Sequence, residues 1–119
     1  MSFDAVGIVA ENPEKSVAFY ALLGVKFAKA GGAEHYEAAT PSGVRLMLDS
    51  VALIRSFDPE WQKPTGCGVV MCFKQASAAD VDRVYSSLVD AGPGLVDRVL
   101  RGVHREHSND ASRIQGVLR

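Results

Sequence analysis

Residues 12–24, NPEKSVAFYALLG, decide the fold of this chain, because they describe a helix with both of its ends marked. Asn12 is suited to cap the first turn, Pro13 to occupy the first helical position, and Gly24 to adopt the left-handed conformation that follows many helices. The apolar side chains of this segment spread over a wide face: Phe19, Tyr20, Leu22 and Leu23. We expect a helix with so wide an apolar face to lie against a sheet.

Short strand patterns lie on both sides of this helix. Residues 3–10 and 25–30 read as strands before and after it, and residues 35–40 and 44–48 follow as two more. In the last of them, the apolar side chains alternate onto one face: Val44, Leu46 and Leu48. Residues 1–49 therefore predict a first module with the order strand, helix, strand, strand, strand.

The second part of the chain starts in the same way. Residues 50–65 form a linker with Pro59, Trp61 and Pro64, in which residues 51–54 can make a short helical turn. Residues 66–74 then read as an apolar strand. Ser77 and Asp80 open a helix over residues 77–91, whose apolar stripe is Val81, Val84, Tyr85, Leu88 and Val89. The repeated strand and helix predict two modules packed in a single domain, 1–119, with the second module starting at 66–92.

Residues 93–119 allow two interpretations. Apolar residues recur at helical spacing over residues 95–107, which favours an amphipathic helix. Alternatively, residues 96–101, 103–106 and 114–118 are degenerate strands. The helical interpretation is the one we follow, and it would leave strand 66–74 with an open edge that favours dimerisation.

Composition places the chain among soluble globular proteins. Of its 119 residues, 47% are hydrophobic and 23% charged. The net charge is -1, so the chain lacks the strongly basic balance that is typical of proteins that bind nucleic acid or membrane surfaces. Cys67 and Cys72 are five residues apart in one apolar run, so a strand would place them on opposite faces, where they cannot pair with each other. No basic residue flanks them, and we expect both thiols to be inert and buried. Two free thiols and no recognisable signal peptide indicate a cytoplasmic protein.

Four segments together carry a resemblance to a known family: FDAVGIVAENPEKSVAFYALLGVKF, PSGVRLMLD, FDPEWQKPTG and GVVMCFKQASAADVDRVYSSLVDAG. In order and spacing they resemble the vicinal oxygen chelate superfamily, which includes glyoxalase I, extradiol dioxygenases and bleomycin-resistance proteins. The resemblance implies an α+β fold of paired strand-helix-three-strand modules, a curved sheet around a pocket, and frequently a homodimer. It stops after Gly92, so we expect the second module to be incomplete or altered.

The resemblance also identifies where a metal ion would bind. Metal-using relatives carry histidine or glutamate at positions that match Ala5 and Val70, and neither of these side chains has a donor atom. Asp49 near the end of the fourth predicted strand is one carboxylate, which is a poor metal site by itself. We therefore predict no cofactor and a likeness to the metal-free members, in which an apolar cleft holds a drug.

The candidate ligand-binding residues are an aromatic and polar set: Tyr36, Met47, Asp49, Trp61 and Phe73. Each also has an ordinary structural explanation, since Tyr36 and Phe73 can pack in a core and Trp61 can fix the linker to the sheet. Asp49, like Glu37, reads as an exposed rim carboxylate.

The histidines offer weaker candidates. His35 can act as a base or a ligand, but its position beside the Gly31-Gly32 turn favours a solvated loop-edge histidine. His104 and His107 share a helical spacing and read as a surface pair. No catalytic residue is identified.

Our leading hypothesis from the sequence is a metal-independent protein that binds a small, partly apolar molecule in a sheet-lined cleft, as a homodimer, without nucleic acid or membrane partners. One alternative is a divalent-metal lyase or dioxygenase that uses Asp49 or Glu37 with a histidine. Another is a degenerate paralogue that only dimerises.

Overall fold

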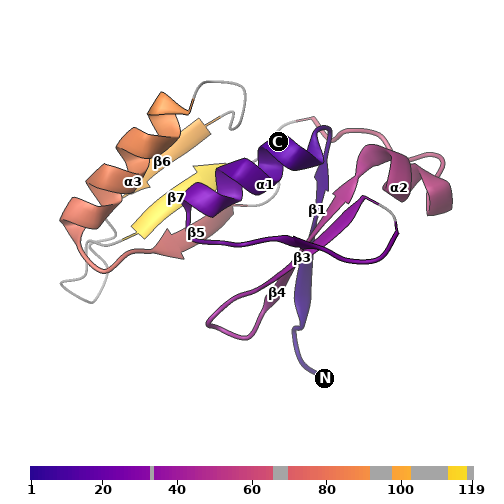
Figure 1. The fold of residues 1–119 in the computed structure, drawn as a ribbon, viewed down its shortest axis with the longest axis horizontal. Coiled ribbons are helices and arrows are strands. Elements are labelled where there is room, and N and C mark those ends of the chain that lie inside the picture. The colour runs from indigo at the N-terminus through magenta and orange to yellow at the C-terminus, as the bar shows by residue number, and fades with distance from the viewer. Residues whose placement is uncertain (33, 66–69, 92–97, 103–112, 118–119) are drawn as a thin grey trace. The chain divides into compact units, whose positions relative to one another are not determined.

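The computed structural model describes residues 1–32, 34–65, 70–91, 98–102 and 113–117 (Figure 1). The chain divides into two compact units, Met1–Lys63 and Pro64–Arg119, and the division falls inside the predicted linker.

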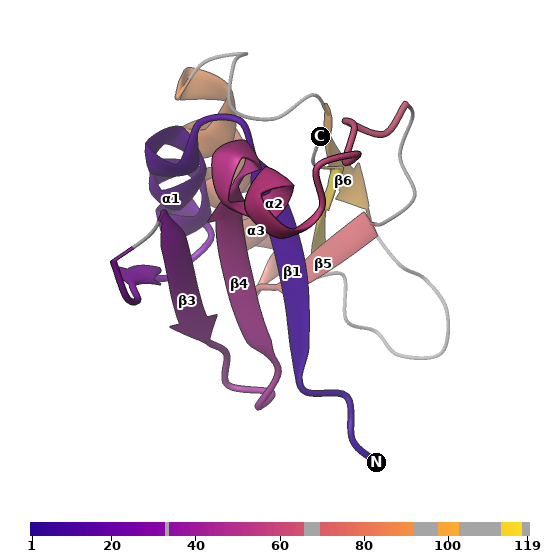
Figure 2. The ribbon, with the colours of Figure 1, turned by 90° about the vertical axis from the view of Figure 1, so that its right-hand side faces the viewer.

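The first unit is a four-stranded mixed sheet with two helices. Its elements are β1 (Ala5–Ala10), α1 (Pro13–Leu22), β2 (Ala28–Lys29), β3 (His35–Ala39), β4 (Arg45–Ser50) and α2 (Val51–Phe57). The strand order is β1-β4-β3-β2, with β1 parallel to β4 and the other pairs antiparallel. Figure 2 shows β1, β4 and β3 side by side. The predicted order strand, helix, strand, strand, strand is therefore confirmed.

Helix α1 begins and ends as its sequence signals predict. The Asn12 side chain accepts a hydrogen bond from the Lys15 N–H at 3.1 Å, and Gly24 adopts a φ of 83°. Phe19 and Tyr20 are buried, at 2% and 1% exposure, whereas Leu22 is 39% exposed. The apolar face that packs is therefore narrower than the sequence suggested.

Strand β4 lies in the middle of the sheet, and its side chains alternate between the two faces. Leu46, Leu48 and Ser50 are buried, and the alternate residues are half-buried, which confirms the predicted alternation. Ser50 ends the strand and caps α2, because its hydroxyl accepts the Leu53 N–H at 3.0 Å. The helical turn predicted at 51–54 is present and continues to Phe57.

The strand predicted at 25–30 is mostly wrong, because only Ala28–Lys29 enter the sheet. The Val25 N–H donates to the Tyr20 carbonyl at 3.0 Å, so this residue closes the end of α1 and does not join a ladder. Val25 is buried there.

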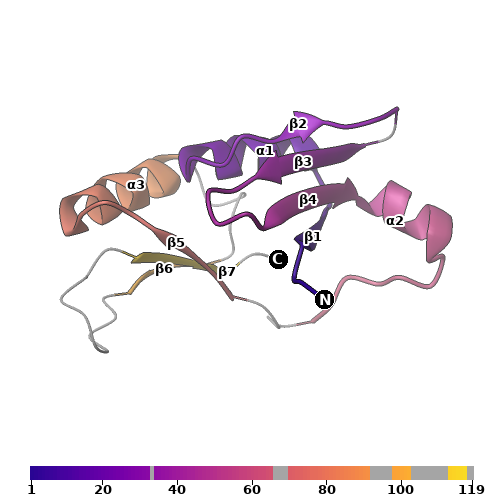
Figure 3. The same ribbon diagram turned by 90° about the horizontal axis from the view of Figure 1, so that it is seen from below.

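In its described residues, the second unit is a three-stranded antiparallel sheet covered by one helix (Figure 3). Its described elements are β5 (Val70–Lys74), α3 (Ala78–Asp90), β6 (Arg98–Gly102) and β7 (Arg113–Val117), and the strand order is β5-β7-β6. Ser77 caps α3 by accepting the Asp80 N–H at 3.1 Å. Within the predicted stripe, Val81 and Leu88 are buried, but Val89 is 58% exposed.

The helix favoured over residues 95–107 is wrong at Arg98–Gly102, which form a strand. Each residue of β6 pairs with a residue of β7. This pairing across the sequence overrides the local helical spacing of the apolar residues. The alternative strands are confirmed at β6 and β7, and residues 103–106 lie outside the described residues.

Because β7 pairs with all of β5, the tail does supply strands to the second sheet. The premise that the tail supplies no strands is therefore wrong, although β5 still lies at one end of the described sheet, and the homodimer stays a prediction. Among the helices that the structure describes, none is long and apolar enough to cross a membrane.

Candidate functional site

The face of the first sheet opposite Leu46 and Leu48 carries most of its charged side chains. We call it the ionic face and define it by five residues: His35 and Glu37 of β3, and Arg45, Met47 and Asp49 of β4. The antiparallel register places His35 opposite Asp49 and Glu37 opposite Met47. On β1, Gly7 pairs with Met47, and a Cβ at Gly7 would lie 3.9 Å from the Met47 terminal methyl.

His35 lies between two carboxylates. Its Nδ1 is 2.5 Å from Asp49 Oδ1, and its Nε2 is 3.0 Å from Glu37 Oε1. The side chains of His35, Glu37 and Asp49 are 24%, 38% and 14% exposed. We call these three residues the histidine array.

Arg45 extends the array along the sheet. Its guanidinium lies 3.3 Å from Glu37 Oε1 and donates to Asp4 Oδ2 at 2.7 Å. Glu37 therefore has two cationic partners, His35 and Arg45, whereas Asp49 faces His35 from the less exposed side.

The charges of the array stabilise one another. The hydrogen bond to Asp49 raises the pKa of His35, the hydrogen bond to Glu37 adds to this, and the partial burial of the ring opposes it. The same contact with His35 lowers the pKa of Glu37, and the charge of Arg45 adds to the lowering. Both shifts favour the charged form of the side chain concerned.

These residues do not fit a metal ion as they are arranged. Each ring nitrogen of His35 already faces a different carboxylate, so the donors surround the imidazole and do not converge on one point. Ala5, which the resemblance in the sequence matches to a metal-ligand position, pairs with Arg45 in the sheet and has no donor atom. Within the described part of the chain, no group of three histidine, cysteine, aspartate or glutamate side chains could hold a metal ion.

The structure brings together two of the five predicted ligand-binding residues, Met47 and Asp49. Tyr36 pairs with Leu48 and is therefore on the opposite face, half-buried. Trp61 lies after α2, where its ring is 5.9 Å from the Arg55 guanidinium. Phe73 is half-buried on β5, in the second unit.

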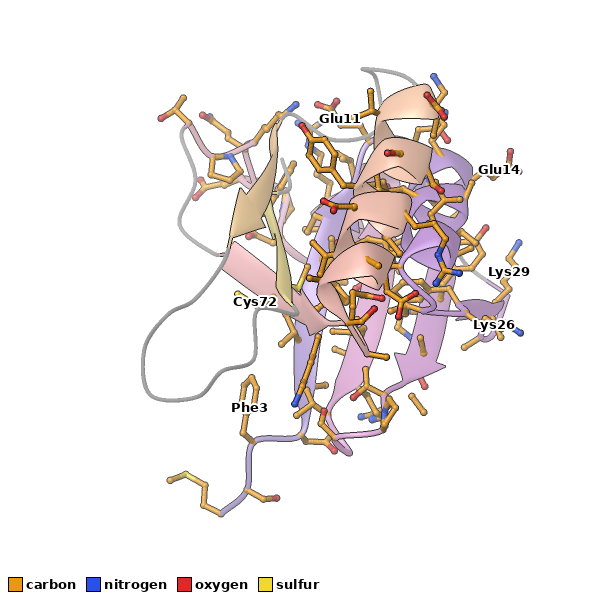
Figure 4. All side chains as sticks on the ribbon, turned by 90° about the vertical axis from the view of Figure 1, so that its left-hand side faces the viewer. Phe3, Glu11, Glu14, Lys26, Lys29 and Cys72 are labelled. Atoms are coloured by element: carbon orange, nitrogen blue, oxygen red, sulfur yellow. The ribbon has the colours of Figure 1, made fainter. Side chains whose placement is uncertain are left out.

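Several expectations about single residues need correction. His35 is a strand residue bonded to two carboxylates and not a solvated loop-edge histidine, and Asp49 is not an exposed rim carboxylate. Cys72 is a free thiol as expected, but it is exposed on β5 and not buried (Figure 4). Cys67, His104 and His107 lie outside the described residues.

The sequence does not predict the histidine array as a whole, although it indicates that two of its members share a face of one strand. The period of two already placed His35 and Glu37 on one side of their strand. The missing step was the register of β3 on β4, which brings Asp49 opposite His35, and nothing in the sequence suggested Arg45 or Asp4.

Comparison with known proteins addresses the fold. No family model matches the chain, and no curated protein matches it. Among solved structures, it is similar to a glyoxalase/bleomycin resistance protein/dioxygenase from Nocardioides, with a TM-score of 0.52 and 24% identity over 77% of this chain and 62% of that one. The fold is glyoxalase/bleomycin-resistance-like. The resemblance seen in the sequence is confirmed at this level.

Two further structures extend the likeness to almost the whole chain. Hypothetical protein SA1046 from S. aureus matches with a TM-score of 0.68 and 13% identity, covering 99% of this chain and 93% of that one. Protein ATC0852 from Agrobacterium tumefaciens matches with a TM-score of 0.62 and 20% identity, covering 99% and 97%. At such identities the likeness shows the fold alone, and the chain spans less than two thirds of the Nocardioides protein.

Proposed function

We propose that this protein binds a small, partly apolar molecule on the ionic face of its first unit, without a metal ion. The observation that carries the proposal is the juxtaposition of an apolar strip, Met47 beside Gly7, with the fixed polar groups of the histidine array. Binding sites for small molecules commonly combine apolar surface with a few positioned polar groups.

The apolar part of the site comes from β1 and β4. Gly7 has no side chain, so no side chain of β1 stands directly beside Met47. The neighbours of Gly7 on the same side of β1 are the uncharged Ala5 and Val9. The Met47 thioether is flexible and polarisable, which lets it adapt to flat or irregular ligands.

The polar part comes from the array. His35 uses one oxygen of each carboxylate, Asp49 Oδ1 and Glu37 Oε1. Among the described residues, the contacts of both groups fall on these oxygens, and the second oxygen of each can accept hydrogen bonds from ligand hydroxyl, amide or amine groups. Because His35 and Arg45 hold these carboxylates in place, a ligand would not have to order them.

Metal independence rests on the residue types at the positions used by metal-binding relatives, Ala5 and Val70, and on the complete use of the His35 nitrogens. The alternative, a divalent-metal lyase or dioxygenase, would need His35 to release a carboxylate. Stoichiometric zinc, iron or nickel retained by the purified protein through dialysis would overturn the metal-independent proposal.

Methionine methyl NMR tests the binding proposal directly, because the chain has three methionines: Met1, Met47 and Met71. We expect aromatic compounds with hydroxyl, amide or amine groups, selected by a thermal-shift screen, to move the Met47 methyl resonance and the Gly7 amide. Met1 and Met71 serve as internal controls, and Met47→Leu assigns the reporter signal.

Gly7→Ala supplies the matching variant. A Cβ at Gly7 meets nothing closer than an ordinary contact of 3.9 Å, so the fold should tolerate it. The added methyl group would occupy space beside Met47 that the proposed ligand needs. We expect ligand affinity to fall roughly tenfold, about 1.4 kcal/mol. Compounds that move Met71 and leave Met47 unchanged would contradict the proposed site, and a screen without any hit would favour the degenerate, dimerising alternative.

A further inference from the structure

In the histidine array, two carboxylate groups face the ring of His35, whereas a neutral histidine ring has one N–H to donate. Both ring nitrogens of His35 face carboxylate oxygens, at 2.5 Å and 3.0 Å. A neutral imidazole carries one N–H, so one of the two contacts would then bring a nitrogen lone pair against a carboxylate. With both carboxyl groups ionised, the arrangement therefore fits the imidazolium, with an N–H on each side.

We infer that Asp49, His35 and Glu37 form a proton-operated switch on the ionic face, in which loss of the His35 proton releases Glu37 while Asp49 keeps its hydrogen bond. This inference goes beyond ligand binding and does not depend on it.

Three observations decide which carboxylate is released. The Asp49 contact is shorter than the Glu37 contact by 0.5 Å, from the two distances of 2.5 Å and 3.0 Å. Asp49 is also less exposed than Glu37, at 14% against 38%, so its hydrogen bond is less screened by water. Glu37 alone has a second cation at hand, with Arg45 at 3.3 Å. The remaining proton therefore stays on Nδ1, and Nε2 is left with a lone pair.

The charged groups around the array define what the switch changes. Besides Asp49 and Glu37, Arg45 lies beside Glu37 and bonds to Asp4. On β2, Lys29 pairs with Tyr36, whose side chain points to the other face, and Lys29 projects outward (Figure 4). With His35 protonated, the imidazolium and the guanidinium face three carboxylates, and after deprotonation the guanidinium faces them alone.

The two states thus offer different chemistry at one place. In the protonated state the carboxylates are partly neutralised and held. In the deprotonated state the face carries one more unit of negative charge, and the Nε2 lone pair lies beside a Glu37 carboxylate that His35 no longer binds. The second state suits a ligand with two donors, such as an ammonium group or a pair of hydroxyls.

Long-range ¹H–¹⁵N NMR spectra of the ¹⁵N-labelled full chain, recorded between about pH 5 and pH 9, test the switch. His35→Asn identifies the His35 signals among the three histidines. Below the midpoint we expect both ring nitrogens protonated. Above it we expect the Nδ1–H tautomer, which is the minor tautomer of unconstrained histidine. In ¹³C spectra of a ¹³C-labelled sample, we expect a change in the Glu37 carboxyl resonance with the same midpoint.

Variants of the carboxylates make the assignment specific. We expect Asp49→Asn to lower the His35 midpoint more than Glu37→Gln does, because the Asp49 hydrogen bond is the larger cause of the raised value. Glu34→Gln, which removes an exposed neighbouring carboxylate, is the control and should leave the midpoint unchanged. An Nε2–H tautomer above the midpoint, or a midpoint that neither Asp49→Asn nor Glu37→Gln moves, would overturn the inference. If Asp49→Asn does not fold, the wild-type tautomer and Glu37→Gln still decide it.

Discussion

The two units of this chain begin alike and end differently. Each starts with a strand and a capped helix, β1 and α1 in one, β5 and α3 in the other. After α1 the first unit adds three strands, and its last strand, β4, returns parallel to β1. After α3 the described part of the second unit has two strands, and its last strand, β7, is antiparallel to β5. The number of chain reversals after the helix therefore fixes the direction of the final strand.

In both units the last strand lies between two others, β4 between β1 and β3 and β7 between β5 and β6. The outward residues of β4 therefore have neighbours on both sides. This placement brings Asp49 against His35 and Met47 against Gly7. A change in strand number would change both neighbours, so the site depends on the complete set of strands in this unit.

Loss of a buried aromatic side chain in α1 should have the largest effect. Phe19 is 2% exposed, so Phe19→Ala leaves a cavity, and we expect the free energy of unfolding to fall by about 4 kcal/mol. Urea unfolding followed by the fluorescence of Trp61, the single tryptophan, measures this in the first unit.

Leu22→Ala on the same helix is the matched control, because Leu22 is 39% exposed and should lose less than about 1 kcal/mol. Equal losses for the two variants would contradict the packing of α1. The prediction of a single domain also requires far-UV circular dichroism to report the same transition as Trp61. Two separate transitions would show that the units unfold independently.

The helix caps should have smaller and comparable effects in the two units. Asn12→Ala removes the acceptor of the Lys15 N–H, and we expect a loss of about 1 kcal/mol. Ser77→Ala should cost at least as much, because the Ser77 hydroxyl also donates to Asp80 Oδ2 at 2.9 Å. Thermal unfolding of both variants measures the difference.

Ser86→Ala, at an exposed position inside α3, is the control for replacing serine by alanine. It should leave stability unchanged or slightly raise it, because alanine is the better helix former. If Ser77→Ala behaved like Ser86→Ala, the capping of α3 would make no contribution to stability.

The sequence predicted the beginnings of both units well because those signals are local. A cap at Asn12, a proline, a glycine exit and the alternation around Leu46 and Leu48 act over a few residues, and the structure reproduces each of them. The tail was predicted as a helix because apolar spacing cannot show which distant strand a segment pairs with.

The candidate site shows the same limit. Met47 and Asp49 were recognised from their position on one strand, whereas the histidine array depends on the register between β3 and β4. That register is set by the turn at residues 40–44, where the Thr40 hydroxyl donates to the Val44 carbonyl and Gly43 adopts a φ of 88°. A shift of this register by one residue would move every side chain of β3 to the other face. The array therefore cannot be predicted from any one of its residues without the register.

The smallest expected effect is the pH dependence of stability in the first unit. Folding raises the pKa of His35, so its contribution is complete below its ordinary value of about 6.5 and is lost as the pH rises through the folded value. Folding lowers the pKa of Glu37, so its contribution is present above about 4.5 and is lost as the pH falls through the folded value. The array should therefore stabilise the first unit most between these two values.

The measurement is the difference in unfolding free energy between the wild type and His35→Gln, followed by Trp61 fluorescence at several pH values. We expect this difference to be greatest near pH 5.5, midway between the two ordinary values of about 4.5 and about 6.5, and to shrink toward both acid and alkaline pH. The effect stays small because water screens the partly exposed array, and added salt should reduce it further. A difference that instead grew steadily with rising pH would mean that His35 folds in its neutral form. In that case the second carboxylate contact could not be a hydrogen bond, and the distinction between the two states of the ionic face would disappear.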